Sequence, residues 1–316
     1  MSKSDLRRAA LSKVLVATCV AVGAASLSLF GAITASAAGA DTVSPAFYLA
    51  LGGSASVGVQ PTVAVPKGQP TNQGYANDIV AYEAARGVTV QLTQLGCPGE
   101  STATMINGND QCYRTHDTQL AQAMSFLLRH RSDQGIVTID LGYNNLRSCF
   151  KAKTVNQLCV ANQLALVRQQ LPTVIAGLKN SAGVGVTFVG VGHYNPFLAS
   201  GVSGPTGQEF ATDTNAVIGQ LNSTLQVLYT NEGIPLAPVA TTFQGRDVQR
   251  VRVSGGAVLP DNVARACALT WMCEAAPYGP NMHPNDAGYA AIALAIESVL
   301  KTPWSATAPT TTTAAA

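Results

Sequence analysis

Short apolar runs alternate with segments of helical periodicity along most of this chain of 316 residues, and this alternation restricts the fold more than any other feature. Two parallel strands need a crossover connection, which is usually a helix. The alternation therefore predicts an α/β fold, a three-layer α/β/α sandwich with a central parallel sheet. The predicted strands are residues 47–51, 88–95, 136–141, 184–191 and 235–242. The predicted helices are residues 75–85, 120–128, 164–178 (with a kink or break at Pro172), 211–229 and 287–300.

The two ends of the chain differ in composition from the rest. Four basic residues precede an apolar run over 14–33, and small residues follow that run, which is typical of a secretory signal peptide over residues 1–40. The alternative is a signal anchor that stays in the membrane. Residues 303–316 are rich in Thr and Ala and have too little apolar content for a core, so they are predicted to form a disordered tail. Residues 41–302 are predicted to form one domain.

Charge excludes one class of partner. Without residues 1–40, which hold four Lys or Arg and one acidic residue, the chain keeps 15 basic and 16 acidic side chains, a net charge of about −1. Nucleic-acid binding asks for clustered Lys and Arg, and no such cluster is present. No other stretch is long and apolar enough to cross a bilayer, so no stable membrane insertion is expected after signal cleavage.

Six cysteines remain beyond residue 40, and an even number in an exported chain favours disulfides and an extracellular location. Fifteen connectivities are possible, so pairing between sequence neighbours is a preference. The preferred pairs are Cys97–Cys112, Cys149–Cys159 and Cys267–Cys273, the last within an aperiodic excursion over 244–279. The spacings lack the repeated C-x-x-C of zinc sites, so no structural metal is expected.

Four short blocks carry residues suited to acyl chemistry. They are Leu-Gly-Gly-Ser-Ala-Ser around Ser54, Gly-Cys-Pro-Gly-Glu-Ser around Gly99, Leu-Gly-Tyr-Asn-Asn around Asn144 and Asn-Met-His-Pro-Asn around His283. A serine nucleophile needs a base, which a histidine can be, and donors aimed at the oxyanion, which a glycine N–H and an asparagine amide can supply. The first three blocks each follow a predicted strand, where open α/β sheets bind ligands.

Serine, glycine, asparagine and histidine in this order resemble the four blocks of the SGNH hydrolases, also called the GDSL esterase/lipase family, and the similarity extends over residues 47–300. The resemblance implies a flavodoxin-like α/β/α fold and a secreted, monomeric serine esterase or lipase without a cofactor. It implies Ser54 as nucleophile, His283 as base, and an oxyanion hole made by Ser54, Gly99 and Asn144. The substrate would be a small-molecule, lipid or acylated-glycan ester.

The chain departs from the family pattern at three acidic positions. Gly53 replaces the Asp of Gly-Asp-Ser, Asn145 replaces the Asp after the block asparagine, and Pro280 stands where Asp usually precedes the histidine by three residues. A backbone carbonyl can also fix an imidazole tautomer. The Pro280 carbonyl is therefore the predicted histidine orienter, with Asn281 as second candidate. More distant acids are third candidates, namely Asp261 and Glu274.

Several alternatives stay open. Ser56 competes with Ser54 as nucleophile, and Gly96 with Gly99 as oxyanion donor. The lost acids suggest a non-catalytic carbohydrate- or lipid-binding protein, and the same residues would also serve an acyltransferase acting on cell-envelope glycans. Asp140 is predicted to make local hydrogen bonds. The other histidines are predicted at the surface or at helix ends, namely His116, His130 and His193.

Overall fold

The computed structural model describes residues 47–109 and 111–300. The predicted signal peptide and the predicted tail lie outside the described residues.

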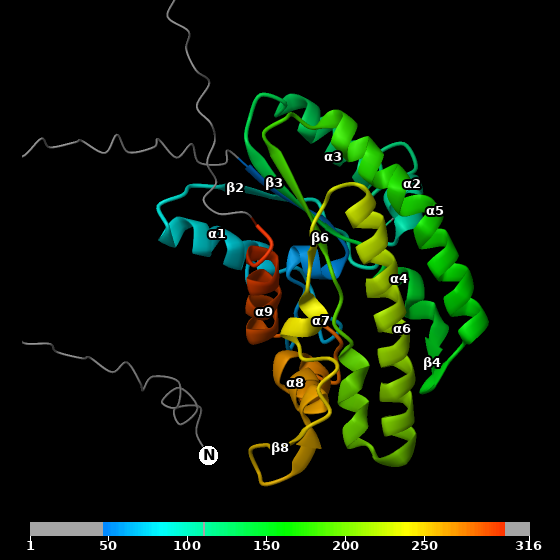
Figure 1. The fold of residues 1–316 in the computed structure, drawn as a ribbon. Helices are drawn as coiled ribbons and strands as arrows, with labels where there is room; N and C mark the ends of the chain where they lie inside the picture. The colour runs from blue at the N-terminus through cyan, green and yellow to red at the C-terminus, as the bar shows by residue number, and fades with distance from the viewer. Residues whose placement is uncertain (1–46, 110, 301–316) are drawn as a thin grey trace, which may run out of the picture. The chain divides into compact units, whose positions relative to one another are not determined.

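A five-stranded parallel sheet forms the centre of the described chain, in the order β2-β1-β3-β6-β7, and confirms the predicted fold class (Figure 1). Its strands are β1 (Phe47–Gly52), β2 (Gln91–Gln94), β3 (Gly135–Asp140), β6 (Val186–Val191) and β7 (Leu236–Ala237). The last prediction is wrong beyond Ala237, because Pro238 precedes the short helix α7 (Val239–Thr242). Proline has no N–H to donate to a neighbouring strand, so pairing stops there.

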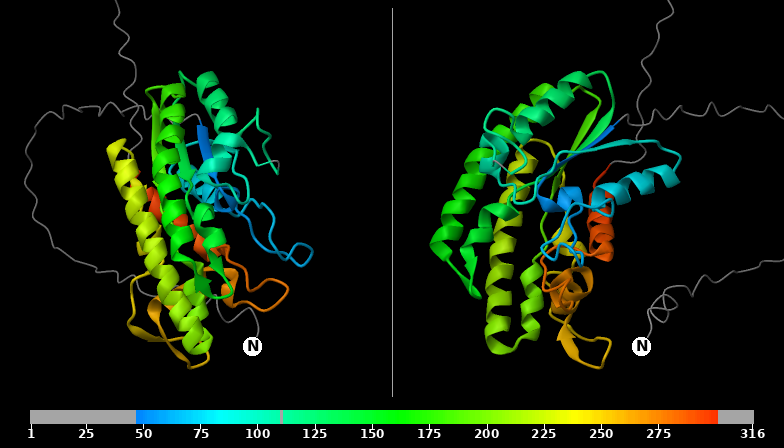
Figure 2. Two further views of the ribbon diagram at one scale, coloured as in Figure 1. Left: turned by 90° about the vertical axis from the view of Figure 1, so that its right-hand side faces the viewer. Right: turned by 180° about the vertical axis from the view of Figure 1, so that it is seen from behind.

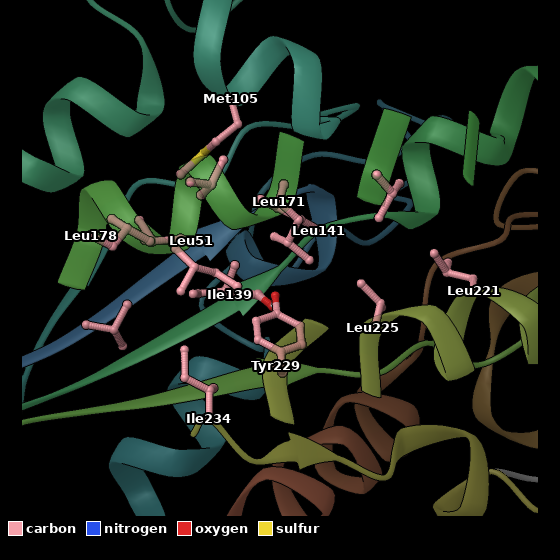
Figure 3. Packing of buried hydrophobic residues seen from close by; sticks show 14 of the residues in the cluster. Leu51, Met105, Ile139, Leu141, Leu171, Leu178, Leu221, Leu225, Tyr229 and Ile234 are labelled. Carbon is pink, nitrogen blue, oxygen red and sulfur yellow. The ribbon is translucent and has the colours of Figure 1, made fainter. Parts of the chain in front are cut away.

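Helices cover both faces of the sheet (Figure 1). One face carries α2 (Thr102–Asn107), α3 (Gln119–Arg129), α5 (Gln157–Ser181) and α6 (Gly204–Asn231). The other carries α1 (Tyr75–Ala85), α7 and α9 (Asp286–Glu297). Each face buries its own apolar cluster against the strands. In the first cluster, Leu51 and Ile139 of the sheet lie among Leu171 and Leu178 of α5 and Tyr229 of α6 (Figure 3).

Helix α5 continues through Pro172, where the sequence predicts a kink or break. A proline inside a helix removes one hydrogen bond to the carbonyl four residues earlier, here that of Arg168. Arg168 is exposed, so water can satisfy this carbonyl. The buried side chains before and after the proline, among them Val167 and Val174, keep both halves packed on one core. Burial therefore outweighs the missing hydrogen bond.

Short elements complete the described chain. Between β3 and α5 the chain forms α4 (Tyr143–Leu146) and the antiparallel pair β4 (Phe150–Lys151) and β5 (Thr154–Val155). The segment between α7 and α9 contains the hairpin β8 (Arg250–Arg252) and β9 (Val258–Pro260), then α8 (Asp261–Leu269), drawn in orange in Figure 2. The 3₁₀ helices are η1 (Ser54–Val57), η2 (Arg147–Cys149), η3 (Pro196–Val202) and η4 (Trp271–Cys273). No helix in the described part of the chain has the length and apolar character to cross a membrane.

The three predicted disulfides are present, and each joins segments that are close in sequence. Cys97–Cys112 closes 15 residues, Cys149–Cys159 closes 10, and Cys267–Cys273 closes 6. The first begins in the loop that carries Gly99. Covalent closure restricts this loop in the unfolded chain as well as in the folded one.

Protein secreted without residues 1–40 should therefore expose no free thiol under denaturing conditions. Peptide mapping should recover the three local linkages. Replacing both Cys97 and Cys112 by Ser should lower the free energy of unfolding by about 2–4 kcal/mol, measured by urea denaturation. Two or more reactive thiols in correctly exported protein would contradict the assignment.

Candidate active site

The ends of β1 and β3 bring the first and third sequence blocks together. Gly53 N–H donates to the Asp140 carbonyl at 3.1 Å, so the two strands stay paired until the turn that carries Ser54. Gly52 is held from the other side by Gln119, which accepts from its N–H at 2.7 Å and donates to its carbonyl at 3.1 Å. Ser54 therefore begins η1 on a turn that is fixed on both sides.

Ser54 and His283 are in direct contact although 229 residues separate them. The Ser54 hydroxyl lies 3.0 Å from His283 Nε2. This distance is within the range for a hydrogen bond between a nucleophile and its base. The structure thus brings together the serine and the histidine that the sequence predicts.

The prediction that the Pro280 carbonyl orients the histidine is wrong, because the side chain of Asn281 occupies that position. Asn281 Oδ1 lies 2.7 Å from His283 Nδ1 and also accepts the His283 backbone N–H at 3.0 Å. Asn281 Nδ2 donates to the carbonyls of Pro66 at 3.0 Å and Lys67 at 3.3 Å.

These contacts fix both the amide and the imidazole. Two carbonyl acceptors around Asn281 Nδ2 require that the oxygen, and not the nitrogen, faces the ring. An acceptor at Nδ1 places the ring proton on Nδ1. His283 Nε2 is then left with a lone pair directed at the Ser54 hydroxyl.

The loop that carries His283 is anchored by its backbone. Trp271 N–H donates to the His283 carbonyl, and Asn281 N–H donates to the Trp271 carbonyl, both at 3.1 Å. From the loop after β6, the Tyr194 hydroxyl donates to the Met282 carbonyl at 2.9 Å. The ring is therefore positioned by a loop with few remaining degrees of freedom.

Burial, and to a smaller extent the nearby positive charge of Arg147, lower the pKa of His283 to about 4. A lowered histidine pKa keeps the ring neutral at neutral pH. A neutral ring can accept the serine proton. No carboxylate contributes to this shift, which agrees with an amide as the orienting group.

Three predicted oxyanion donors lie in the first three blocks. The backbone N–H groups of Ser54 and Gly99 donate to no acceptor among the described residues. Gly99 has φ +87°, a conformation that glycine adopts without strain. Asn144 Nδ2 donates one of its two hydrogens to the Glu100 carbonyl at 3.0 Å. Its second hydrogen is available for a ligand.

Two of the departures from the family pattern have a structural reason. A Cβ at Gly53 would lie 2.7 Å from Asn144 Nδ2, so glycine lets this amide approach the serine turn. Asn145 is buried, accepts the Thr102 N–H at 3.1 Å and donates to the Thr102 hydroxyl at 2.9 Å. An ionised aspartate could not make the second of these bonds.

The alternative residues have structural roles. Ser56 is fully buried, and its hydroxyl donates to the Gly53 carbonyl at 2.7 Å. Gly96 packs against this serine, since a Cβ there would lie 1.9 Å from Ser56 Oγ. Asp261 lies 3.6 Å from Arg265, its (i, i+4) neighbour.

The surface prediction for His193 is wrong. His193 is buried and, like Asp140, lines a cavity beside Ser54. The prediction failed because β6, the strand before His193, lies between two other strands of the sheet, and the local sequence does not indicate this position. His130, by contrast, is the C-cap of α3, as predicted, and pairs with Asp133 at 2.7 Å.

One supporting residue has no sequence signal. Gln119 on α3 contacts Gly52 and also donates to the Glu100 carboxylate at 2.8 Å. It therefore joins the serine turn to the loop of the second block. A glutamine at a helix start is too common for the sequence alone to single it out.

Residues 50–291 match the GDSL-like lipase/acylhydrolase family, and the chain belongs to this family. Phospholipase A1 from Streptomyces albidoflavus has the same fold, with 18% identity and a TM-score of 0.50 over 81% of this chain and 99% of that one. A G-D-S-L family protein from Veillonella parvula matches with 14% identity and a TM-score of 0.44, over 80% of this chain and 96% of that one. A lipase/acylhydrolase from Enterococcus faecalis matches with 12% identity and a TM-score of 0.45, over 80% of this chain and 93% of that one. No curated protein matches the chain.

Replacing the orienting amide by a carboxylate should raise the pKa of His283. In Asn281→Asp, a negative charge next to Nδ1 favours the imidazolium. An NMR titration of the ring should show a pKa near 4 in the parent protein and a value at least about one unit higher in the variant. Asn156→Asp is the matched control, because Asn156 caps α5 and aspartate caps equally well. An unchanged titration in Asn281→Asp would contradict the contact.

Proposed function

We propose that this protein is a secreted, monomeric serine ester hydrolase that acts through an acyl-enzyme. The observation that carries this proposal is the continuous series Asn281 Oδ1, His283 and Ser54, joined at 2.7 and 3.0 Å. Membership of a lipase/acylhydrolase family supports the reaction class. The three disulfides support an extracellular location.

Each residue has one role in the proposed reaction. Ser54 Oγ attacks the ester carbonyl while His283 Nε2 takes its proton. The developing oxyanion accepts hydrogen bonds from the N–H groups of Ser54 and Gly99 and from Asn144 Nδ2. His283 then protonates the departing alcohol, and water, activated by the same ring, hydrolyses the acyl-enzyme. Asn281 keeps the proton on Nδ1 throughout.

The two rival functions use the same atoms differently. A non-catalytic binding protein would need no acceptor at His283 Nδ1, so the 2.7 Å contact with Asn281 favours catalysis. An acyltransferase would pass the acyl group to a glycan alcohol instead of water. Product analysis with a soluble glycan acceptor separates transfer from hydrolysis.

Ser54→Ala and His283→Ala should each reduce kcat for ester hydrolysis by about 10⁴-fold or more, because nucleophile and base act as one unit. Circular dichroism and the thermal midpoint should stay close to those of the parent protein. The substrate series is p-nitrophenyl esters from acetate to palmitate. Ser56→Ala is the control and should retain most of its turnover. A dead Ser56→Ala beside an active Ser54→Ala would show that the nucleophile is misassigned.

The pH profile of kcat/KM should have its acidic limb near pH 4, because the base must be neutral and burial lowers its pKa to about 4. Activity should fall about tenfold for each pH unit below this value and stay near its plateau at pH 5. An imidazole with its ordinary pKa of about 6.5 would already have lost about thirtyfold at pH 5. A limb at pH 6–7 would show that His283 is not desolvated.

A further inference from the structure

A small cavity lies directly beside the proposed nucleophile. Ser54 and His283 line it together with Tyr75, Ile292, Asp140 and His193, and we call these last four residues its inner walls. The cavity volume is about 50 Å³. One water needs roughly 10–15 Å³ of such space, so the cavity holds a chain of only a few non-hydrogen atoms.

The inner walls are closed to solvent. Tyr75 is 0% exposed, Ile292 2% and His193 6%. During ester hydrolysis the alcohol must leave before water attacks the acyl-enzyme. A leaving group held in a closed cavity would be trapped behind the acyl group, so the part of the ester that suits this space is the acyl part.

One wall of the cavity is polar. Asp140 is 8% exposed, and its carboxylate accepts no hydrogen bond from any residue in the described ranges. Its neighbour is His193, with Nδ1 at 3.6 Å from Asp140 Oδ1, which is too long for a hydrogen bond. His193 Nε2 lies 3.0 Å from the Leu141 carbonyl and therefore carries a proton.

The gap between these two groups fits one further polar atom. An oxygen placed about 2.8 Å from both Asp140 Oδ1 and His193 Nδ1 would make a good hydrogen bond with each. A hydroxyl group is both a donor and an acceptor, so it can bridge Asp140 and His193 whenever one of the two facing atoms carries a proton and the other does not. A methyl group in the same place would leave a buried carboxylate without a partner, which is costly.

We propose that this cavity binds the acyl group of the substrate and selects short acyl chains that carry a hydroxyl group, with Asp140 and His193 as the residues that determine specificity. This inference rests on the proposed function. The hydroxyl group bridges Asp140 and His193, and the acyl carbonyl lies at Ser54. Longer alkyl chains are excluded by the closed inner wall.

Matched pairs of phenyl esters test this proposal in the parent protein. Glycolyl and propionyl groups have the same size, as do 3-hydroxypropionyl and butyryl groups. Each kcat/KM is divided by the rate of hydroxide-catalysed hydrolysis, which removes intrinsic reactivity. We expect the hydroxylated member of at least one pair to be favoured by about tenfold or more. The phenyl ester of octanoic acid should be hydrolysed at least about a hundredfold more slowly than that of propionic acid.

Variants assign the preference to the polar wall. Asp140→Asn and His193→Gln should each bring the ratio within a pair close to one, and the thermal midpoint of each variant checks that it is folded. If the Asp140 variant does not fold, the His193 variant decides. Tyr229→Phe is the matched control, since its hydroxyl contacts the Ile139 carbonyl at 3.3 Å on the other face of the sheet. Its ratios should equal those of the parent.

Each failure has a distinct signature. If the parent protein hydrolyses the propionyl ester but the ratio of kcat/KM within each pair is one, the proposed selection of hydroxylated acyl groups is wrong and the esterase proposal stands. The phenyl ester of glycine carries an ammonium group in place of the hydroxyl of the glycolyl ester. If it reacts faster than the glycolyl ester, the site prefers a cation and the proposed hydroxyl ligand is wrong. Folded variants with unchanged ratios overturn the roles of Asp140 and His193. Absence of hydrolysis for every ester overturns the proposed function itself.

Discussion

The close approach of β1 and β3 at their last residues is the constraint on which the rest of the site depends. A Cβ at Gly52 would lie 2.0 Å from the Asp140 carbonyl oxygen, and Gly52 has φ +124°. Only glycine fits both conditions without strain. The strands therefore stay paired to their ends, which sets the serine turn beside the turn that carries Asn144. A side chain here would separate the nucleophile from one of its proposed oxyanion donors.

Neutral amide side chains hold the imidazole and the loops of the site in place, where the family pattern has acidic side chains. Asn281 orients the imidazole, Asn145 joins two blocks, and Gln119 holds the serine turn. An amide donates and accepts at once, so one side chain satisfies two backbone segments. Its burial also costs less than burial of a carboxylate. The consequence is a histidine without a stabilising negative charge, so burial and the positive charge of Arg147 lower its pKa unopposed.

Periodicity predicted most of the fold because buried strands and amphipathic helices have distinct patterns. The prediction failed where one residue overrode the pattern, at Pro238, and where packing overrode one residue, at Pro172. In the site, Ser54, Asn144 and His283 were readable because their blocks are local in sequence. Asn281 was predicted only as the second candidate for the histidine orienter, because its role depends on the carbonyls of Pro66 and Lys67, 215 and 214 residues away. Side-chain identity says nothing about where such backbone acceptors lie.

The double use of Asn281 has an evolutionary consequence. A single base change converts an asparagine codon into an aspartate codon, so a conventional acid at this position is one mutational step away. That step would supply a negative charge to the imidazole but would remove the donor that binds the carbonyls of Pro66 and Lys67. The gain in basicity and the loss of the loop anchor come from the same atom replacement. Lineages of this protein can therefore adopt the acid only after another contact secures the 66–67 loop.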